Sequence, residues 1–181
     1  MRQDSHYTYG DDGEQIELRP ADKIAVDLEA AGTADLPAGV IADLRRQSDP
    51  LRGSVVLLRS DDLAAAVVDA LESVGALHPV YTSEDGALLV VLPEVRVEVE
   101  DEAQAAKLRK HLDKTGSVEV VRDTGELLVL RPTSHRGDDA LELANDITEF
   151  VDPPLAQARF LRVVPRPGSA AGGPRSRRQR R

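Results

Sequence analysis

Two kinds of hydrophobic spacing alternate along residues 93–167, and their order restricts how this part of the chain can fold. The stretch EVRVEVE (94–100) alternates valine with charged residues, which is the period of a strand buried on one face. The next stretch, DEAQAAKLRKHLDKTG (101–116), spaces its apolar residues three or four apart and begins with two acids. This pattern predicts a helix that stops at Gly116.

The segments that follow repeat the strand pattern. SVEVVR (117–122) and ELLVLRP (126–132) are each rich in β-branched or aliphatic residues. Asp123, Thr124 and Gly125 lie between them and have the composition of a tight turn. The sequence therefore predicts a β-hairpin here.

A second helix and a last strand complete the region. GDDALELANDITEF (137–150) places its apolar residues on one helical face. Either Asp138 or Asp139 is expected to cap this helix, and the two prolines at 153–154 are expected to end it. QARFLRVVP (157–165) then has the composition of a strand.

The resulting order, β-α-β-β-α-β, predicts an α+β fold in which residues 93–167 form a ferredoxin-like unit, with two helices on one face of a four-stranded antiparallel sheet. Residues 14–92 carry a similar but less regular pattern and predict a smaller, degenerate α/β unit. We expect residues 1–13 to be mobile and residues 168–181 to be a disordered arginine-rich tail. The predicted core of the second half consists of large apolar residues: Val97, Leu108, Leu112, Val120, Leu128, Leu143, Ile147 and Phe160.

The net charge of −9 is unevenly distributed, because the last sixteen residues carry +6 without an acid and the rest carry −15. Residues 1–165, with a net charge of −15, repel phosphate groups, which argues against specific nucleic-acid binding. The chain has no cysteine, which excludes disulfides and thiolate metal sites, and no apolar run of about 18 residues that could span a membrane. Its N-terminus lacks the apolar region of a secretory signal, so we expect a cytoplasmic protein without membrane association.

Three motifs occur in order in the second half: EVVR (119–122), GDDALELAN (137–145) and ARFLR (158–162). Their order and spacing resemble the N-terminal prodomain of bacterial subtilisin-like serine proteases, the subtilases. The resemblance covers residues 93–167 and, more weakly, the first half, since longer subtilase prodomains carry an extra segment. It implies a protein that binds a protease as inhibitor and folding chaperone.

The sequence departs from a subtilase precursor in that the prodomain-like region leads into an arginine-rich tail and not into a catalytic domain. We therefore expect no enzymatic activity, no cofactor and no metal. The histidines have no serine and aspartate at triad spacing and are expected to be structural or surface residues: His6, His78, His111 and His135.

The resemblance also implies which residues contact the partner. In the subtilases the sheet of the prodomain packs on two parallel surface helices of the protease, acidic side chains cap those helices, and the C-terminal segment lies in the active-site cleft. Two hairpin acids and one segment match these roles: Asp123, Glu126, and the run Val163, Val164, Pro165 and Arg166. Alternatively, the acids are ordinary turn residues and the prolines mark a strand that leaves the sheet.

Two functions follow as hypotheses. In the first, the protein binds a subtilisin-like protease in trans as inhibitor or folding chaperone. In the second, it is an adaptor or regulatory subunit of a larger bacterial assembly that keeps the prodomain fold, with a partner encoded nearby.

Overall fold

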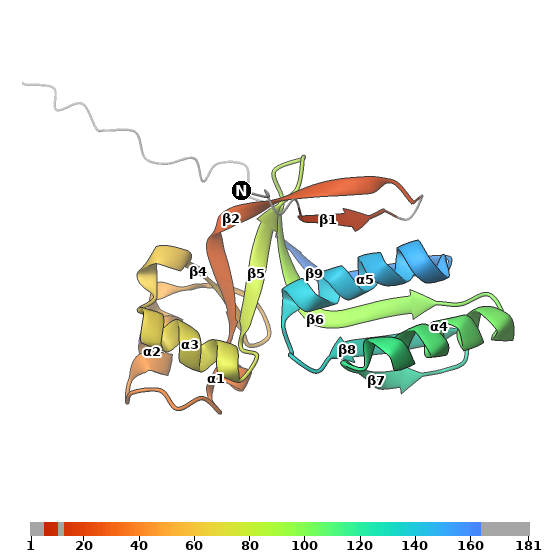
Figure 1. Cartoon of the computed structure of the whole chain (residues 1–181). Coiled ribbons are helices and arrows are strands. Elements are labelled where there is room, and N and C mark those ends of the chain that lie inside the picture. Colours follow the sequence, from red (N-terminus) through yellow and green to blue (C-terminus); the bar gives the residue numbers. More distant parts are fainter. Residues whose placement is uncertain (1–5, 11–12, 164–181) are drawn as a thin grey trace, which may run out of the picture.

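The computed structural model describes residues 6–10 and 13–163 (Figure 1). Within these residues the chain is a mixed α+β structure with nine strands and five α-helices. The strands are β1 (His6–Tyr9), β2 (Gln15–Asp27), β3 (Asp49–Arg52), β4 (Val55–Arg59), β5 (Leu77–Thr82), β6 (Leu88–Glu98), β7 (Val118–Asp123), β8 (Leu127–Pro132) and β9 (Leu155–Val163). The helices are α1 (Leu28–Ala31), α2 (Val40–Gln47), α3 (Ala65–Ser73), α4 (Glu102–Thr115) and α5 (Gly137–Val151).

The strands form one mostly antiparallel sheet with the order β3-β4-β2-β5-β6-β8-β7, in which β1 also pairs with β2 and β9 with β6. The long strand β6 joins the two halves of the chain, because its start pairs with β5 and its end pairs with β8. The expected boundary between residues 92 and 93 therefore falls inside a continuous strand. The register of β6 with β9 shifts there, between Val91 and Val95.

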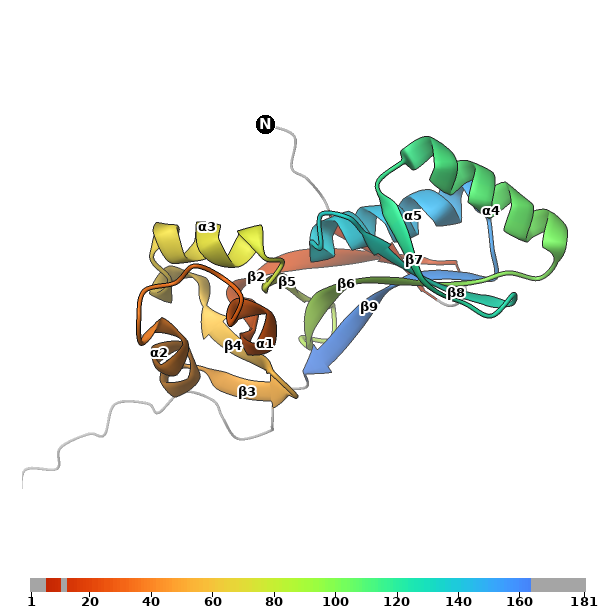
Figure 2. The ribbon, with the colours of Figure 1, turned by 90° about the horizontal axis from the view of Figure 1, so that it is seen from below.

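In the second half the elements follow in the order β6, α4, β7, β8, α5 and β9, which is the order that the sequence predicts. Strand β6 lies between β8 and β9, and β7 pairs with the far side of β8. The strands are thus arranged as β9-β6-β8-β7. Helices α4 and α5 both lie on one side of these strands (Figure 2). On the opposite side no other described element covers β7 and β8, whereas the start of β6 and the end of β9 pack there in a small apolar cluster with residues of β3 and β4.

The larger apolar core lies between these two helices and the sheet. Five of the predicted core residues are buried: Val97, Leu108, Leu128, Leu143 and Ile147. Leu112 and Phe160 are partly buried and pack against the same core. The prediction for Val120 is wrong, since 50% of this residue is exposed. The reason is that β7 is the end strand of the sheet and, in the described part of the chain, has a neighbouring strand on one side alone.

The helix ends agree with the sequence only in part. Helix α4 begins after Asp101, whose side chain caps it, and ends at Gly116, which has a φ of 68° in the left-handed region that favours glycine. The expected cap of α5 is wrong, because Arg136 occupies the N-cap position without a side-chain hydrogen bond. Asp138 and Asp139 lie instead in the first turn, where a carboxylate still interacts favourably with the helix dipole.

Strand β1 corrects the expectation that residues 1–13 are mobile throughout. His6–Tyr9 pair with the start of β2 and lie against α5 (Figure 1). The Tyr7 hydroxyl donates to Glu149 Oε1 at 2.8 Å, and Asn145 Nδ2 donates to the carbonyl oxygen of Tyr7 at 2.8 Å. The hydrogen bond to Glu149, followed by burial, raises the pKa of Tyr7 to about 12.

The first half of the chain has a core of its own under α1, α2 and α3, which lie together at one end of the molecule (Figure 1). Its centre consists of fully or largely buried aliphatic residues, among them Val26, Val56, Leu58, Leu71 and Leu77. The side chains of β4 alternate between this core and a smaller cluster on the other face of the sheet. Burial on both faces explains why VVLL (55–58) is continuously apolar.

His78 is a buried titratable group of the first half. It lies in β5, is 4% exposed, and its Nδ1 has no hydrogen-bond partner among the described residues. Burial lowers the pKa of His78, and the nearby Asp27 carboxylate offsets this effect in part. Asp27 itself caps α1 and accepts a hydrogen bond from Ser54 at 2.7 Å.

The burial of His78 predicts a pH dependence of stability. Because the folded-state pKa lies below the ordinary value of about 6.5, the unfolded chain binds a proton that the folded chain excludes. The free energy of unfolding should therefore be highest above about pH 6.5 and fall as the pH drops from about 7.5 to 5.5. Denaturant unfolding at a series of pH values measures this fall.

The matched variant for this measurement is His78→Asn, which cannot titrate. It should flatten the dependence over the same interval, whatever its effect on overall stability. If the wild-type and variant slopes are equal, His78 does not control the dependence. The interval stays above about pH 5 because the pKa values of Asp27 and Glu94 are lowered, so their stabilising effect is lost in more acidic solution.

Candidate partner-binding surface

The side of the sheet that faces away from α4 and α5 is rich in charged residues. Val95 and Val97 point into the core, so the alternate residues of β6 point to the opposite side. Among them, Glu94 accepts hydrogen bonds from Arg131 of β8 at 2.8 Å and from Arg159 of β9 at 2.6 Å. This arrangement ties three neighbouring strands together across the open face of the sheet.

The pKa of Glu94 reflects these contacts. Burial by itself would raise the pKa, but the hydrogen bonds and positive charges of Arg131 and Arg159 outweigh it and hold the pKa of Glu94 below its ordinary value. Glu94 is therefore ionised at neutral pH. Arg96 and Glu98 form a further ion pair along β6, so the open face presents paired charges of both signs.

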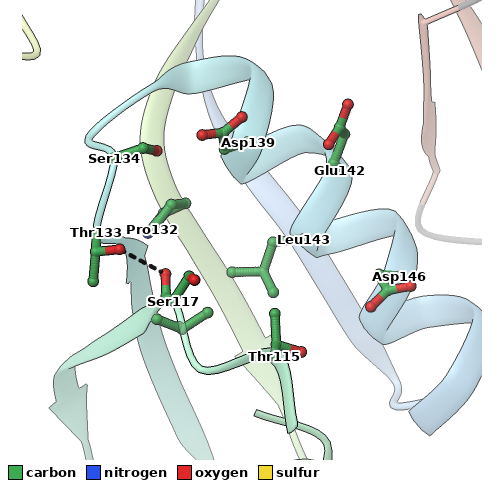
Figure 3. A pocket seen from close by; sticks show the side chains of 10 residues that line it. Thr115, Ser117, Pro132, Thr133, Ser134, Asp139, Glu142, Leu143 and Asp146 are labelled. Carbon is green, nitrogen blue, oxygen red and sulfur yellow. Dashed lines mark hydrogen bonds between the residues drawn. The ribbon is translucent and has the colours of Figure 1, made fainter. Parts of the chain in front are cut away.

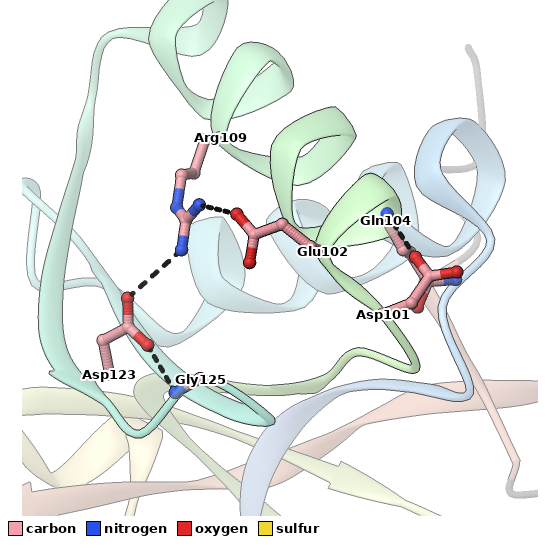
Figure 4. Close-up of polar contacts among 6 residues, drawn as sticks. All are labelled: Asp101, Glu102, Gln104, Arg109, Asp123 and Gly125. Atoms are coloured by element: carbon pink, nitrogen blue, oxygen red, sulfur yellow. Dashed lines mark hydrogen bonds and ion pairs between the residues drawn. The ribbon is translucent and has the colours of Figure 1, made fainter.

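Asp123, the first of the two predicted hairpin acids, lies at the end of β7 and is engaged within the chain (Figure 4). Its Oδ1 accepts a hydrogen bond from the Gly125 backbone N–H at 2.8 Å, and its Oδ2 lies 3.9 Å from Arg109 of α4. It is opposite Leu128, whose side chain is in the core under the helices. Asp123 therefore points to the helix side of the sheet and supports the turn.

Glu126, the second hairpin acid, has a different environment. It is exposed, and its side chain makes no hydrogen bond or ion pair within the described part of the chain. Its carbonyl oxygen accepts the backbone N–H of Val99 at 3.0 Å, which fixes the backbone of the turn. Of the two acids, Glu126 is the one whose carboxylate is available to a partner.

The predicted cleft segment begins at the end of β9. Val163 is the last residue of that strand, pairs with Leu88 of β6, and packs in part against the small cluster on the open face. It is thus held by the fold. Val164, Pro165 and Arg166 lie outside the described residues.

A groove of about 570 Å³ lies on the helix side of the second half. It is bounded by the end of α4, the start of β7, the end of β8 and the first half of α5 (Figure 3). Val118, Pro132 and Leu143 form its apolar part, and Asp139, Glu142 and Asp146 of α5 line one side (Figure 3). Hydroxyl groups from the end of α4 and from the loops contribute the rest, and the lining contains no lysine, arginine or histidine among the described residues.

The acidic side of the groove belongs to a row of carboxylates along α5. Asp139, Glu142, Asp146 and Glu149 are spaced three or four residues apart, which places them on neighbouring turns of one helix face. His111 of α4 contacts Asp146, with 2.8 Å between its Nε2 and Oδ2. The spacing is visible in the sequence, but it does not reveal the groove, because Val118 and Pro132 of the apolar lining come from other elements.

The described residues contain no group of three or more His, Asp or Glu side chains arranged to hold a metal ion. None of the helices in those residues has both the length and the apolar composition needed to cross a membrane. His6 stacks obliquely on Tyr81, with 5.0 Å between ring centroids, and His111 stacks on Phe150 at 5.6 Å. Both histidines thus have an aromatic neighbour, and His111 also contacts the Asp146 carboxylate.

A scan against models of protein families gave no match for this chain, and searches of curated proteins and of solved structures gave none either.

Proposed function

We propose that the protein is a non-catalytic binding module that acts in the cytoplasm on a subtilisin-like serine protease, as an inhibitor or folding chaperone in trans. The observation that carries this proposal is the combination of the three ordered motifs with the strand order β9-β6-β8-β7 and two helices on one side. We interpret residues 93–167 as a ferredoxin-like unit of the prodomain type. Such a unit leaves one face of its sheet open to a partner.

The course of β9 supports the same proposal. The strand is held by β6 over most of its length and ends at Val163, so the residues that follow start from a fixed point at the edge of the sheet. An extended segment that starts there can add to an exposed strand of a protease while its side chains enter the substrate pockets. Because Val163 is itself part of β9, the segment assigned to the cleft is Val164 to Arg166.

The proposal is tested by two truncations of the full chain. Ending the chain at Pro167 removes the arginine-rich tail, and ending it at Val163 removes the proposed cleft segment but leaves β9 intact. We expect the chain that ends at Pro167 to inhibit a purified bacterial subtilisin as well as the full chain does. The chain that ends at Val163 should lose inhibition, because it has no residues to place in the cleft. Hydrolysis of a chromogenic peptide measures both.

Circular dichroism and thermal unfolding of the two truncated chains serve as controls for the fold. The assays are run at two salt concentrations, since contacts of exposed arginines weaken as salt increases. If the chain that ends at Val163 inhibits as strongly as the full chain, the cleft mechanism is wrong. If the full chain neither inhibits subtilisin nor speeds the refolding of its denatured catalytic domain, the proposed function is wrong.

The groove beside α5 favours the second candidate, an adaptor or regulatory subunit. An apolar floor with carboxylates and without cations suits a peptide segment that carries both aliphatic and basic side chains. The variant Asp139→Asn with Glu142→Gln removes two charges from the groove and leaves the open face and β9 unchanged. A loss of partner binding in this variant, with full binding by the chain that ends at Val163, would identify the adaptor.

A further inference from the structure

Strand β7 ends the sheet, and its outer edge has no neighbour among the described residues. In Figure 1 it lies at the lower margin of the second half. Residues of β7 whose backbone N–H and C=O groups are directed away from β8 therefore leave these groups free at the outer edge. Such an edge can pair with another strand.

The side chains at the centre of this edge are apolar and exposed. Val120 is 50% exposed and Val121 is 44% exposed, which makes them two of the most exposed large hydrophobic residues in the described chain. The register of β7 with β8 shifts between Val120 and Arg122, so Val121 is an extra residue in the strand. A β-bulge of this kind places the two valines side by side.

Charged residues flank the two valines, one of each sign. Glu119 is opposite Arg131 of β8 and Arg122 is opposite Val129, so both point to the open face of the sheet. Both are exposed, and neither makes a side-chain hydrogen bond or ion pair within the described residues. The order along the strand is acid, valine, valine, base. When two copies of this segment run antiparallel, the acid of each copy therefore lies opposite the base of the other.

We propose that a second copy of the chain pairs with β7 in an antiparallel manner, about a two-fold axis between Val120 and Val121. In this register Glu119 lies opposite Arg122 of the partner subunit, and Arg122 lies opposite Glu119 of the partner subunit. Each valine lies opposite the other valine of the partner subunit. The contact thus buries four exposed valines on one side of the joined sheet and forms two ion pairs on the other.

Charge complementarity is what favours a second copy over a merely protected edge. Bulges and charged residues often block edge strands, but blocking needs only one sign of charge, most commonly lysine. Here Glu119 and Arg122, which carry opposite charges, are equally far in sequence from the midpoint between Val120 and Val121. A pair of six-residue strands buries less area than a standard protein interface, so the dimer should be weak and its population should rise with protein concentration.

This dimer does not depend on the proposed function. Strand β7 is at one edge of the second half and β9 is at the other, so the end of β9 and the dimer contact lie on opposite sides of β6 and β8. A dimer without protease inhibition, or inhibition by a monomer, would separate the two proposals.

The test is a charge exchange in the full chain, followed by sedimentation velocity over a range of protein concentrations. Glu119→Arg alone and Arg122→Glu alone each place like charges opposite one another twice per dimer, and each should raise the dimer dissociation constant by about tenfold or more. The double variant restores opposite charges and should return the constant to near its original value. Glu84→Arg, in the turn between β5 and β6, is the matched control and should leave it unchanged.

A cross-linking measurement tests the register independently, because the chain contains no cysteine. Chains with Glu119→Cys mixed with chains with Arg122→Cys should form a disulfide-linked pair faster than either variant alone, since directly opposite strand residues have the spacing that a disulfide requires. A full chain that stays monomeric at every concentration overturns the proposal. So does a double charge variant that is folded but does not recover the dimer.

Discussion

Ile147→Ala and Leu108→Ala are each expected to lower the free energy of unfolding by roughly 2 to 5 kcal/mol, the range for truncation of a large buried aliphatic side chain. Both residues are 0% exposed and belong to the core of the second half, Ile147 from α5 and Leu108 from α4. Each truncation leaves a cavity between a helix and the sheet that the neighbouring side chains can fill only in part. Denaturant unfolding should show a lower midpoint with little change in slope.

Val120→Ala is the matched control when unfolding is measured at a protein concentration that keeps the chain monomeric, because Val120 is an aliphatic residue of the same unit with 50% exposure. Its truncation should change the free energy of unfolding by less than about 0.5 kcal/mol, as is usual for surface positions. If truncation at Leu108 or Ile147 costs no more than truncation at Val120, that residue does not belong to the core.

The second large effect is expected at Gly137, the first residue of α5. A Cβ atom at this position would lie 2.3 Å from the carbonyl oxygen of Val91 and 2.8 Å from Cδ of Pro79. Neither neighbour can turn aside, because one is backbone of β6 and the other is a proline ring in β5. Gly137→Ala should therefore push α5 away from the sheet and lower the free energy of unfolding by at least about 3 kcal/mol, the upper end of the range for overpacking.

The sign of this prediction opposes helix propensity, by which alanine is favoured over glycine by about 1 kcal/mol. Gly116→Ala is the matched control, since Gly116 has a φ of 68° but no heavy atom within 4 Å of the added Cβ. It should cost only about 1 to 2 kcal/mol for the left-handed backbone. If Gly137→Ala is no more destabilising than Gly116→Ala, the close approach of α5 to β6 is not rigid.

The elements of the second half could be predicted because their signals are local. The apolar period of each segment, the acid before α4 and the glycine after it all act within a few residues of the place that they determine. The cap of α5 could not be predicted in the same way. Its first turn is positioned by the contact of Gly137 with β5 and β6, which are far away in sequence.

The hairpin that carries Asp123 and Glu126 was predictable in its position, but the side of the sheet on which Asp123 lies was not. The turn chemistry of Asp123 and Gly125 correctly predicts a hairpin, yet the side on which Asp123 lies depends on the bulge at Val121. One extra residue in a strand moves every later side chain to the other face. Asp123 consequently contacts Arg109 of α4, and Glu126 is left as the free carboxylate of the hairpin.

The sequence by itself determined the α+β class, the order of the elements in the second half and most of its core, because these depend on hydrophobic period and on local turn and cap residues. Only the tertiary structure decided how the halves join, where β1 lies and which of the two hairpin acids is engaged within the chain. Strand β6 pairs with β5, β8 and β9 at once, and Tyr7 hydrogen-bonds to Glu149 across most of the length of the chain. Such contacts join segments whose own hydrophobic patterns do not identify their partners. The pairing is decided only by packing and strand register in the folded chain.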